Sequence, residues 1–281
     1  MMKILITGGS SYFGQQLVPL ALPDFEVCYT YFQNDPLALP NGYRLEIRDE
    51  TAVSRLISSF QPDCIIHLAG SNRGADMAAV IVQGTNHVTQ AAAQANIRLL
   101  HMSTDVVFDG LKPPYDETAV PTPVNAYGQA KAEAEAIVQN YPNHVIIRTS
   151  LIYSLEQMDH GTSWMVAALR EGKPVTLFNN QLRNPVWATT LGQACLELAT
   201  NSFTGILHVA GGQTMTRADF SLKMLEWWGI TERDTLTIGP STSGDWPLDL
   251  TLDVGKGTAV LQTPLLSVDQ VIQLAQTVKN S

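Results

Sequence analysis

The chain has 281 residues, of which 45% are hydrophobic and 15% are charged, a composition that supports a globular fold with a substantial core. A formal net charge of −9 argues against a nucleic-acid-binding surface, because phosphate backbones require clustered Lys and Arg. No apolar run approaches the roughly 20 residues that span a bilayer, and the start Met1–Ile4 leads into a strand and not a signal peptide. The cysteines are isolated, as expected for reduced thiols in a cytoplasmic protein, and the scattered histidines predict no metal site.

The first predicted element is a short apolar strand, Lys3–Thr7, followed by a glycine turn and an amphipathic helix, Gln15–Leu22. Gly8 and Gly14 have the spacing of the outer glycines of a dinucleotide-binding turn, and Ser11 stands in the middle position where Gly is usual. In such a turn, backbone N–H groups at the start of the helix attract a pyrophosphate. The pattern predicts a dinucleotide site, although a tight strand-to-helix turn without a ligand would look the same.

Apolar, β-branched runs then alternate with helical patterns as far as residue 150. Further strands are predicted at Phe25–Thr30, Tyr43–Ile47, Cys64–Leu68, Ile97–Met102 and Val145–Ile147, and helices at Thr51–Phe60, Met77–Ala95 and Ala126–Asn140. Near-continuous apolar strands separated by helices predict an α/β fold with a Rossmann-like, doubly wound parallel sheet. Residues 1–150 are therefore expected to form the dinucleotide-binding domain, with ligands at the carboxyl ends of the strands.

Residues 151–281 have a less regular pattern, which predicts a smaller lobe that is integrated with the first domain. Helices are expected at Thr162–Glu171, Thr190–Ala199, Thr216–Trp228 and Val268–Val278, a strand at Val175–Phe178 and a polar loop at Asn179–Trp187. By its placement, this lobe is expected to cover the reactive end of the cofactor and to select the substrate.

Tyr127 and Lys131 are four residues apart in a predicted helix and therefore share one helix face. An ammonium beside a phenol lowers the pKa of the phenol, which favours proton exchange with a carbonyl. Thr104, at the end of the preceding apolar strand, would hydrogen-bond the same substrate oxygen. The Tyr-Lys spacing is also common on solvated helix faces, so the prediction of a hydride-transfer site depends on the dinucleotide turn as well.

Several further motifs stand in a fixed order along the chain. They are Ile4–Gly8, Pro62–Gly70, Ser103–Gly110, Pro114–Glu117, Tyr127–Lys131, Arg148–Ser150 and His208–Gly211. Through these motifs the chain resembles an extended short-chain dehydrogenase/reductase, and within that group the dTDP-4-dehydrorhamnose reductase family. The resemblance covers nearly the whole chain and is closest in the first half.

This resemblance implies an NAD(P)H-dependent oxidoreductase that reduces the 4-keto group of a nucleotide-linked deoxysugar, as in dTDP-rhamnose biosynthesis. Tyr127 would be the general acid, Lys131 would lower its pKa and hold the nicotinamide ribose, and Thr104 would orient the carbonyl. Asp105, beside the active-site threonine, would contact sugar hydroxyls or satisfy the backbone N–H groups of a turn. The resemblance also makes a homodimer an expectation.

Most of the expected cofactor-binding residues lie at the ends of predicted strands, and two lie on the helix that carries Tyr127. They are Gly8, Ser10, Tyr12, Phe13, Gly14, Thr30, Glu46, Ile47, Leu68, Ala69, Gly70, Ser103, Tyr127, Lys131 and Thr149. The second strand ends at Tyr29–Phe32 with neither an acid for a ribose 2′-OH nor an Arg for a 2′-phosphate, so the choice between NADPH and NADH stays open. The lack of a repelling carboxylate favours NADPH.

The substrate region departs from the family pattern at Asn180–Val186, at Trp246-Pro247 and at Leu151. Arg183 in the first of these is expected to pair with a substrate diphosphate, the alternative being a surface arginine. The sugar and the base therefore stay undetermined.

Three other functions are compatible with the same fold. A dehydratase is disfavoured, because Val106 stands where that chemistry needs a Glu. A nucleotide-sugar 4-epimerase uses the same Thr, Tyr and Lys. A regulatory subunit resembling that of methionine adenosyltransferase is the non-catalytic alternative, and retention of Thr104, Tyr127 and Lys131 favours catalysis over it.

Overall fold

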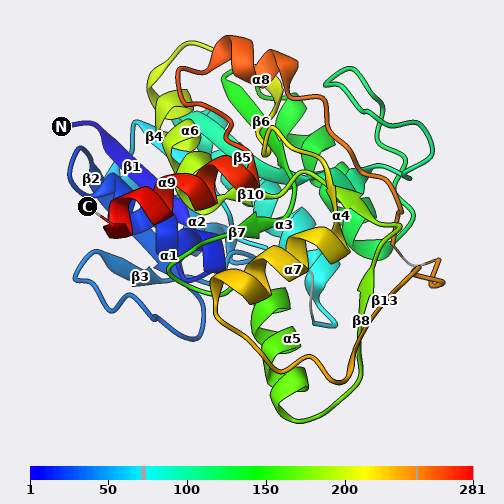
Figure 1. Ribbon diagram of the computed structural model, residues 1–281. Coiled ribbons are helices and arrows are strands. Elements are labelled where there is room, and N and C mark those ends of the chain that lie inside the picture. Colours follow the sequence, from blue (N-terminus) through cyan, green and yellow to red (C-terminus); the bar gives the residue numbers. More distant parts are fainter. Residues whose placement is uncertain (71–73, 245, 281) are drawn as a thin grey trace.

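A parallel sheet of seven strands forms the centre of the computed structural model, which describes residues 1–70, 74–244 and 246–280 (Figure 1). The strand order is β11-β6-β5-β4-β1-β2-β3. The strands are β1 (Lys3–Thr7), β2 (Glu26–Tyr31), β3 (Gly42–Arg44), β4 (Cys64–His67), β5 (Arg98–Thr104), β6 (His144–Thr149) and β11 (Gly205–His208). All neighbouring pairs are parallel, which confirms the predicted doubly wound fold.

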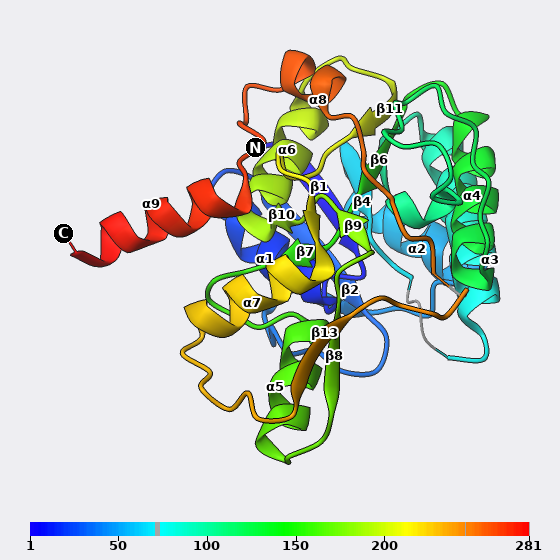
Figure 2. The same ribbon diagram turned by 45° about the vertical axis from the view of Figure 1, so that its right-hand side comes forward.

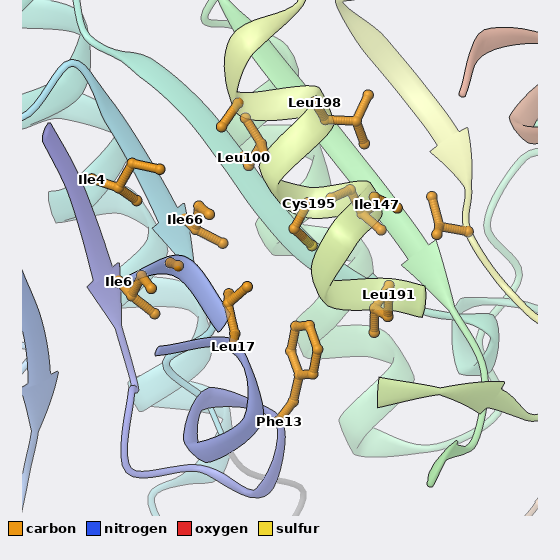
Figure 3. Close-up of a cluster of buried hydrophobic side chains, with 14 of the residues drawn as sticks. Ile4, Ile6, Phe13, Leu17, Ile66, Leu100, Ile147, Leu191, Cys195 and Leu198 are labelled. Carbon is orange, nitrogen blue, oxygen red and sulfur yellow. The ribbon is translucent and has the colours of Figure 1, made fainter. Parts of the chain in front are cut away.

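Helices cover both faces of this sheet and bury its apolar strands. On one face lie α2 (Glu50–Phe60), α3 (Met77–Ala95) and α4 (Ala126–Gln139), and on the other lie α1 (Tyr12–Ala21) and α6 (Ala188–Thr200). Figure 3 shows Phe13 and Leu17 of α1 beside Leu191 and Cys195 of α6, packed on the strands. The cysteines at 28, 64 and 195 are all buried and free.

The second half of the chain also contributes to the central layers. Strand β11, which the sequence analysis did not predict, pairs with β6 in the register Ile206↔Ile146, and α6 packs beside α1. The run Gly205–His208 is only four residues long, too short for its alternation of apolar and polar residues to indicate a strand. Its pairing with β6 defines it as one. Residues on both sides of position 150 therefore build one sheet and one core.

Of the remaining elements, η1 directly follows β5, and the others form the smaller lobe and the chain end. The full set is η1 (Asp105–Val107), β7 (Ile152–Tyr153), α5 (His160–Arg170), β8 (Val175–Phe178), β9 (Leu182–Arg183), β10 (Val186–Trp187), β12 (Met215–Thr216), α7 (Arg217–Trp227), β13 (Leu236–Gly239), α8 (Gly255–Val260) and α9 (Val268–Asn280). The segment 179–187, expected as a loop, contains β9 and β10, because short partners elsewhere in the chain pair with them. Figure 2 shows α5, β8, β13 and α7 grouped in the lobe and α9 pointing away from the body. Among the described residues, no helix combines the length and hydropathy needed to cross a bilayer.

A buried ion pair fixes α4 to the sheet. Arg148 of β6 and Glu135 of α4 are 1% and 0% exposed, and Nη2 of the arginine lies 2.8 Å from Oε2 of the glutamate. Arg148 Nε also donates to both carboxylate oxygens, at 3.1 and 3.2 Å, and the Ser103 hydroxyl of β5 donates to Oε1. The guanidinium carbon lies 5.0 Å from the centre of the Phe108 ring. The pair thus holds one helix and two strands in a fixed relation.

We predict that Arg148→Met lowers the free energy of unfolding by about 3–5 kcal/mol, because it leaves the Glu135 carboxylate buried without its partner. The double variant Arg148→Met/Glu135→Leu is expected to recover part of that loss, since no charge then remains buried. Urea unfolding of the three proteins measures both effects. The matched control is Lys173→Met, which breaks a solvent-exposed pair with Glu171 and should cost less than about 1 kcal/mol. A double variant that is no more stable than Arg148→Met would contradict the prediction.

Candidate active site

The carboxyl end of β5 and the first turn of α4 bring Thr104 and Tyr127 together. Thr104 caps η1, with its Oγ1 accepting a hydrogen bond from Val106 N at 3.2 Å, and Asn125 caps α4 by accepting from Gly128 N at 2.8 Å. A Cβ on Gly128 would lie 2.3 Å from Val106 O, so only glycine lets the helix approach η1 this closely. The Thr104 hydroxyl lies close enough to the Tyr127 phenol to lower its pKa.

The electrostatic surroundings of Tyr127 differ from the sequence-based expectation. Burial and the nearby Asp105 carboxylate raise the pKa of Tyr127 to about 12, and the hydrogen bond with Thr104 opposes them. The expected lowering by Lys131 is not observed, because the Lys131 ammonium is engaged elsewhere: Nζ donates to Met102 O at 2.6 Å and lies 3.2 Å from His101 Nε2. A phenol with this pKa is protonated at neutral pH.

The Lys131 side chain is buried, one helical turn after Tyr127. Burial lowers the pKa of Lys131 to about 8, and the Glu135 carboxylate acts in the opposite direction. Burial and the Lys131 charge also lower the pKa of His67, to about 3, and that of His101, so both rings are neutral at pH 7. The His67 ring is held between the hydroxyls of Thr7, at 2.6 Å, and Thr85, at 3.1 Å. The positions of these two histidines near the lysine were not predictable from local sequence, since the pairing of β4 with β5 brings them there.

Asp105 links this site to the smaller lobe. Its Oδ1 accepts from Thr104 Oγ1 at 3.1 Å and its Oδ2 from Ser150 Oγ at 2.6 Å, and Arg183 Nε lies 3.9 Å away. Burial raises the pKa of Asp105, while the Arg183 charge and the two hydroxyls oppose that rise. With its oxygens shared among these groups, Asp105 positions side chains around Thr104.

Arg183 is 4% exposed, so it is not a surface arginine. Its Nη1 donates to the carbonyls of Leu182, at 2.6 Å, and Leu248, at 3.1 Å, and its Nη2 to that of Pro247, at 2.9 Å. The guanidinium therefore holds the 247–248 segment beside Asp105. Recognition of a diphosphate by this side chain stays a prediction.

The glycine turn lies at the neighbouring strand ends, next to β4. Gly8 has φ +72°, and a Cβ there would lie 2.8 Å from Ala69 Cα. Ser11, in the position where Gly is usual, caps α1 by accepting from Gly14 N at 3.0 Å, which accounts for the departure. Thr30 Oγ1 accepts from Gly8 N at 3.1 Å and so ties the end of β2 to this turn.

Other predicted cofactor-binding residues fall into two groups. Those at the open edge of the sheet are Ser10, Tyr12, Glu46, Leu68, Ala69 and Gly70, all partly or fully exposed. Those with buried side chains are Phe13, Ile47, Ser103 and Thr149. The Thr149 hydroxyl donates to Val209 O at 2.7 Å, and Phe13 packs in the core, so these two can offer a ligand only their backbone. Within the described ranges, no cluster of His, Cys, Asp and Glu is suited to hold a metal ion.

We predict that Lys131→Met stabilises the protein at pH 7, on the order of 2–3 kcal/mol, because it removes a buried charge. The folded protein releases the Lys131 proton near pH 8, whereas the unfolded chain releases it near 10.5, the ordinary pKa of a lysine. Wild-type stability therefore rises relative to the variant between those values, and the difference should shrink by about pH 10. Urea unfolding at both pH values tests this, with the exposed Lys112→Met as a pH-independent control. A destabilised Lys131→Met at pH 7 would show that its hydrogen bonds outweigh the buried charge.

Comparison with known proteins identifies one matching family model and several relatives. Residues 2–251 match the model of the RmlD substrate binding domain. A dTDP-4-keto-6-deoxy-D-glucose reductase of Streptomyces niveus is 29% identical over 214 residues, 73% of this chain and 71% of that protein. Methionine adenosyltransferase 2 subunit beta of Xenopus laevis is 29% identical over 209 residues, 69% of this chain but only 63% of the subunit.

Solved structures agree with the fold. A hypothetical dTDP-4-dehydrorhamnose reductase from Sulfolobus tokodaii superimposes with a TM-score of 0.83 and 29% identity, covering 95% of this chain and 98% of that one. The Bordetella bronchiseptica enzyme WbmG, in complex with NAD and UDP, has a TM-score of 0.81 at 21% identity, covers 95% of this chain and 90% of its own, and supports the fold alone. Because the family match extends over most of the sequence and includes the Thr104, Tyr127 and Lys131 motifs, this chain belongs to the RmlD substrate binding domain family.

Proposed function

We propose that the protein reduces the 4-keto group of a nucleotide-linked deoxysugar with hydride from NADPH or NADH. The observation that carries the proposal is the proximity of the Thr104 and Tyr127 hydroxyls, with Lys131 one turn further on and the glycine turn at the neighbouring strand ends. Family membership and the similarity to the Streptomyces niveus reductase support the substrate class.

The residues present fit a dinucleotide. Helix α1 begins at the glycine turn with no acid in its first turn, so the positive end of its dipole is left for a pyrophosphate. Gly8 and Gly14 pack tightly against backbone and keep this turn close to β4. A bound nicotinamide would supply the hydride, and Lys131 would hold its ribose.

The residues of this chain would then transfer a proton to the substrate and position its keto group. Thr104 and Tyr127 would both hydrogen-bond the keto oxygen of the substrate. As that oxygen gains negative charge, Tyr127 donates its proton, which the raised pKa of about 12 keeps in place until then. The low dielectric around the buried groups strengthens these hydrogen bonds in the transition state.

The first test is a panel of nucleotide-linked 4-ketosugars with NADPH and with NADH, followed by the loss of nicotinamide absorbance. We expect turnover with at least one 4-keto-6-deoxysugar nucleotide and none with the corresponding 4-hydroxy sugar. Interconversion of 4-hydroxy epimers without net consumption of the reduced cofactor would instead identify a 4-epimerase.

The second test is Tyr127→Phe, which should lower kcat by about 10²–10⁴-fold, because the proton donor is lost. Binding of the reduced cofactor, measured by fluorescence, should change little. Tyr141→Phe is the matched control, because the Tyr141 hydroxyl lies at the other end of α4 and donates to Ile97 O, at 2.8 Å. Wild-type kcat in Tyr127→Phe would remove this residue from the mechanism.

A regulatory role is the second candidate, favoured by the methionine adenosyltransferase 2 beta subunits among the relatives. It predicts cofactor binding without reduction of any member of the panel, together with a stable complex with a methionine adenosyltransferase catalytic subunit. Size-exclusion chromatography of the mixed proteins would detect that complex.

A further inference from the structure

A buried histidine in the middle of β5, His101, contacts the ammonium group of Lys131. Its Nε2 atom lies 3.2 Å from Lys131 Nζ, and the side chain is 1% exposed. Burial and the Lys131 charge lower the pKa of His101, so the ring is neutral at pH 7. Because an ammonium group has only donors, Nε2 is the acceptor in this contact, and the hydrogen of the neutral ring is on Nδ1.

The Nδ1 atom of His101 has no hydrogen-bond partner among the residues that the structure describes. Burying an unpartnered N–H group costs free energy, which an aliphatic side chain at this position would avoid. Aliphatic residues do occupy the adjacent positions: Leu99 and Leu100 precede His101 on β5, and Ile146 of β6 pairs with it in register. The feature that distinguishes the histidine from these neighbours is its Nε2 acceptor.

The strand next to β5 restricts the orientation of the His101 ring. The ring of His67, its register partner on β4, lies 5.3 Å away between centroids. His67 is itself held by the hydroxyls of Thr7, at 2.6 Å, and Thr85, at 3.1 Å. The Nε2 acceptor therefore stands at a fixed place facing the helix that carries Lys131.

Two acceptors from consecutive residues of β5 hold the Lys131 ammonium. Nζ donates to the carbonyl of Met102, at 2.6 Å, as well as to His101 Nε2. Within the described part of the chain these are its hydrogen bonds, so one of the three N–H groups of the ammonium remains for a ligand. The two contacts with β5 fix the position from which that N–H is offered.

Burial works against the charge on Lys131. It lowers the pKa of Lys131 to about 8, although the Glu135 carboxylate opposes this change. That carboxylate is already paired with Arg148, which limits what it offers the lysine. A neutral acceptor that hydrogen-bonds the ammonium favours the charged form without adding a second charge. The other titratable groups that act on the contact are the rings of His67, from β4, and His144, from β6.

We propose that His101 is a positioning residue for Lys131, whose Nε2 acceptor keeps the buried side chain in its ammonium form and leaves one N–H for the bound cofactor. This inference deepens the proposed function and rests on it, since it concerns the part that Lys131 has in that reaction.

The test measures the pKa of Lys131 by NMR of isotope-labelled lysine side chains, without cofactor, with Lys131→Met identifying the signal. His101→Leu should lower this pKa by about 1–2 pH units from the wild-type value of about 8, the effect of losing one hydrogen bond to a charged group. His101→Gln should stay near wild type, because its amide oxygen reaches the place of Nε2. His101→Asn, which is one bond shorter, should behave as His101→Leu.

His144→Leu is the matched control, because it removes a buried histidine of β6 whose Nδ1 contacts the carbonyl of Tyr141. It should leave the pKa of Lys131 near its wild-type value. If His101→Leu does not fold, the comparison of His101→Gln with His101→Asn decides alone. An unchanged or raised pKa of Lys131 in the Leu and Asn variants would overturn the inference. An equal fall in His101→Gln or His144→Leu would also overturn it, because altered packing alone would then be the cause.

The second readout is the pH profile of kcat with an accepted 4-ketosugar. Activity should fall as the pH rises through the pKa of Lys131, and in His101→Leu this fall should begin about 1–2 pH units lower than in wild type. A fall at the wild-type pH would overturn the inference. A pKa of Lys131 that follows the acceptor at position 101, in a protein that reduces no 4-ketosugar, would support this inference and contradict the reaction. Turnover with the same pKa of Lys131 in wild type and His101→Leu would do the reverse.

Discussion

The buried ion pair between Arg148 and Glu135 is the constraint on which the candidate site depends. It joins β6 to α4, and the Ser103 hydroxyl brings β5 into the same contact. Tyr127 and Lys131 precede Glu135 on α4, and Thr104 directly follows Ser103. Fixing the helix against these two strands therefore fixes the phenol near the threonine hydroxyl.

Burial sets the protonation states around that contact. It raises the pKa of Tyr127, lowers that of Lys131 and keeps the rings of His67 and His101 neutral. Desolvation penalises the charged form of each group, so one physical cause acts in opposite directions on acids and bases. The result is a protonated phenol on the same helix as an ammonium that burial destabilises.

The smaller lobe reaches the same site through Asp105 and Arg183. Asp105 is bonded to Thr104 and Ser150 and lies beside Arg183, which in turn holds the 247–248 segment. The departures from the family pattern in the second half of the chain thus lie against the residues that position Thr104. The smaller lobe and the surroundings of Thr104 are thus coupled, because Asp105 contacts both.

The sequence by itself determined the local structure: the strand Lys3–Thr7 and the helix Met77–Ala95 occur as predicted, and Tyr127 and Lys131 share a helix because their spacing is local. Periodicity reports the burial of one segment at a time, so it says little about which segments meet. Only the tertiary structure decided that β11 completes the sheet and that Lys131 contacts His101 instead of lowering the pKa of Tyr127. Those results depend on strand pairing and on desolvation, which arise when residues distant in the chain come together.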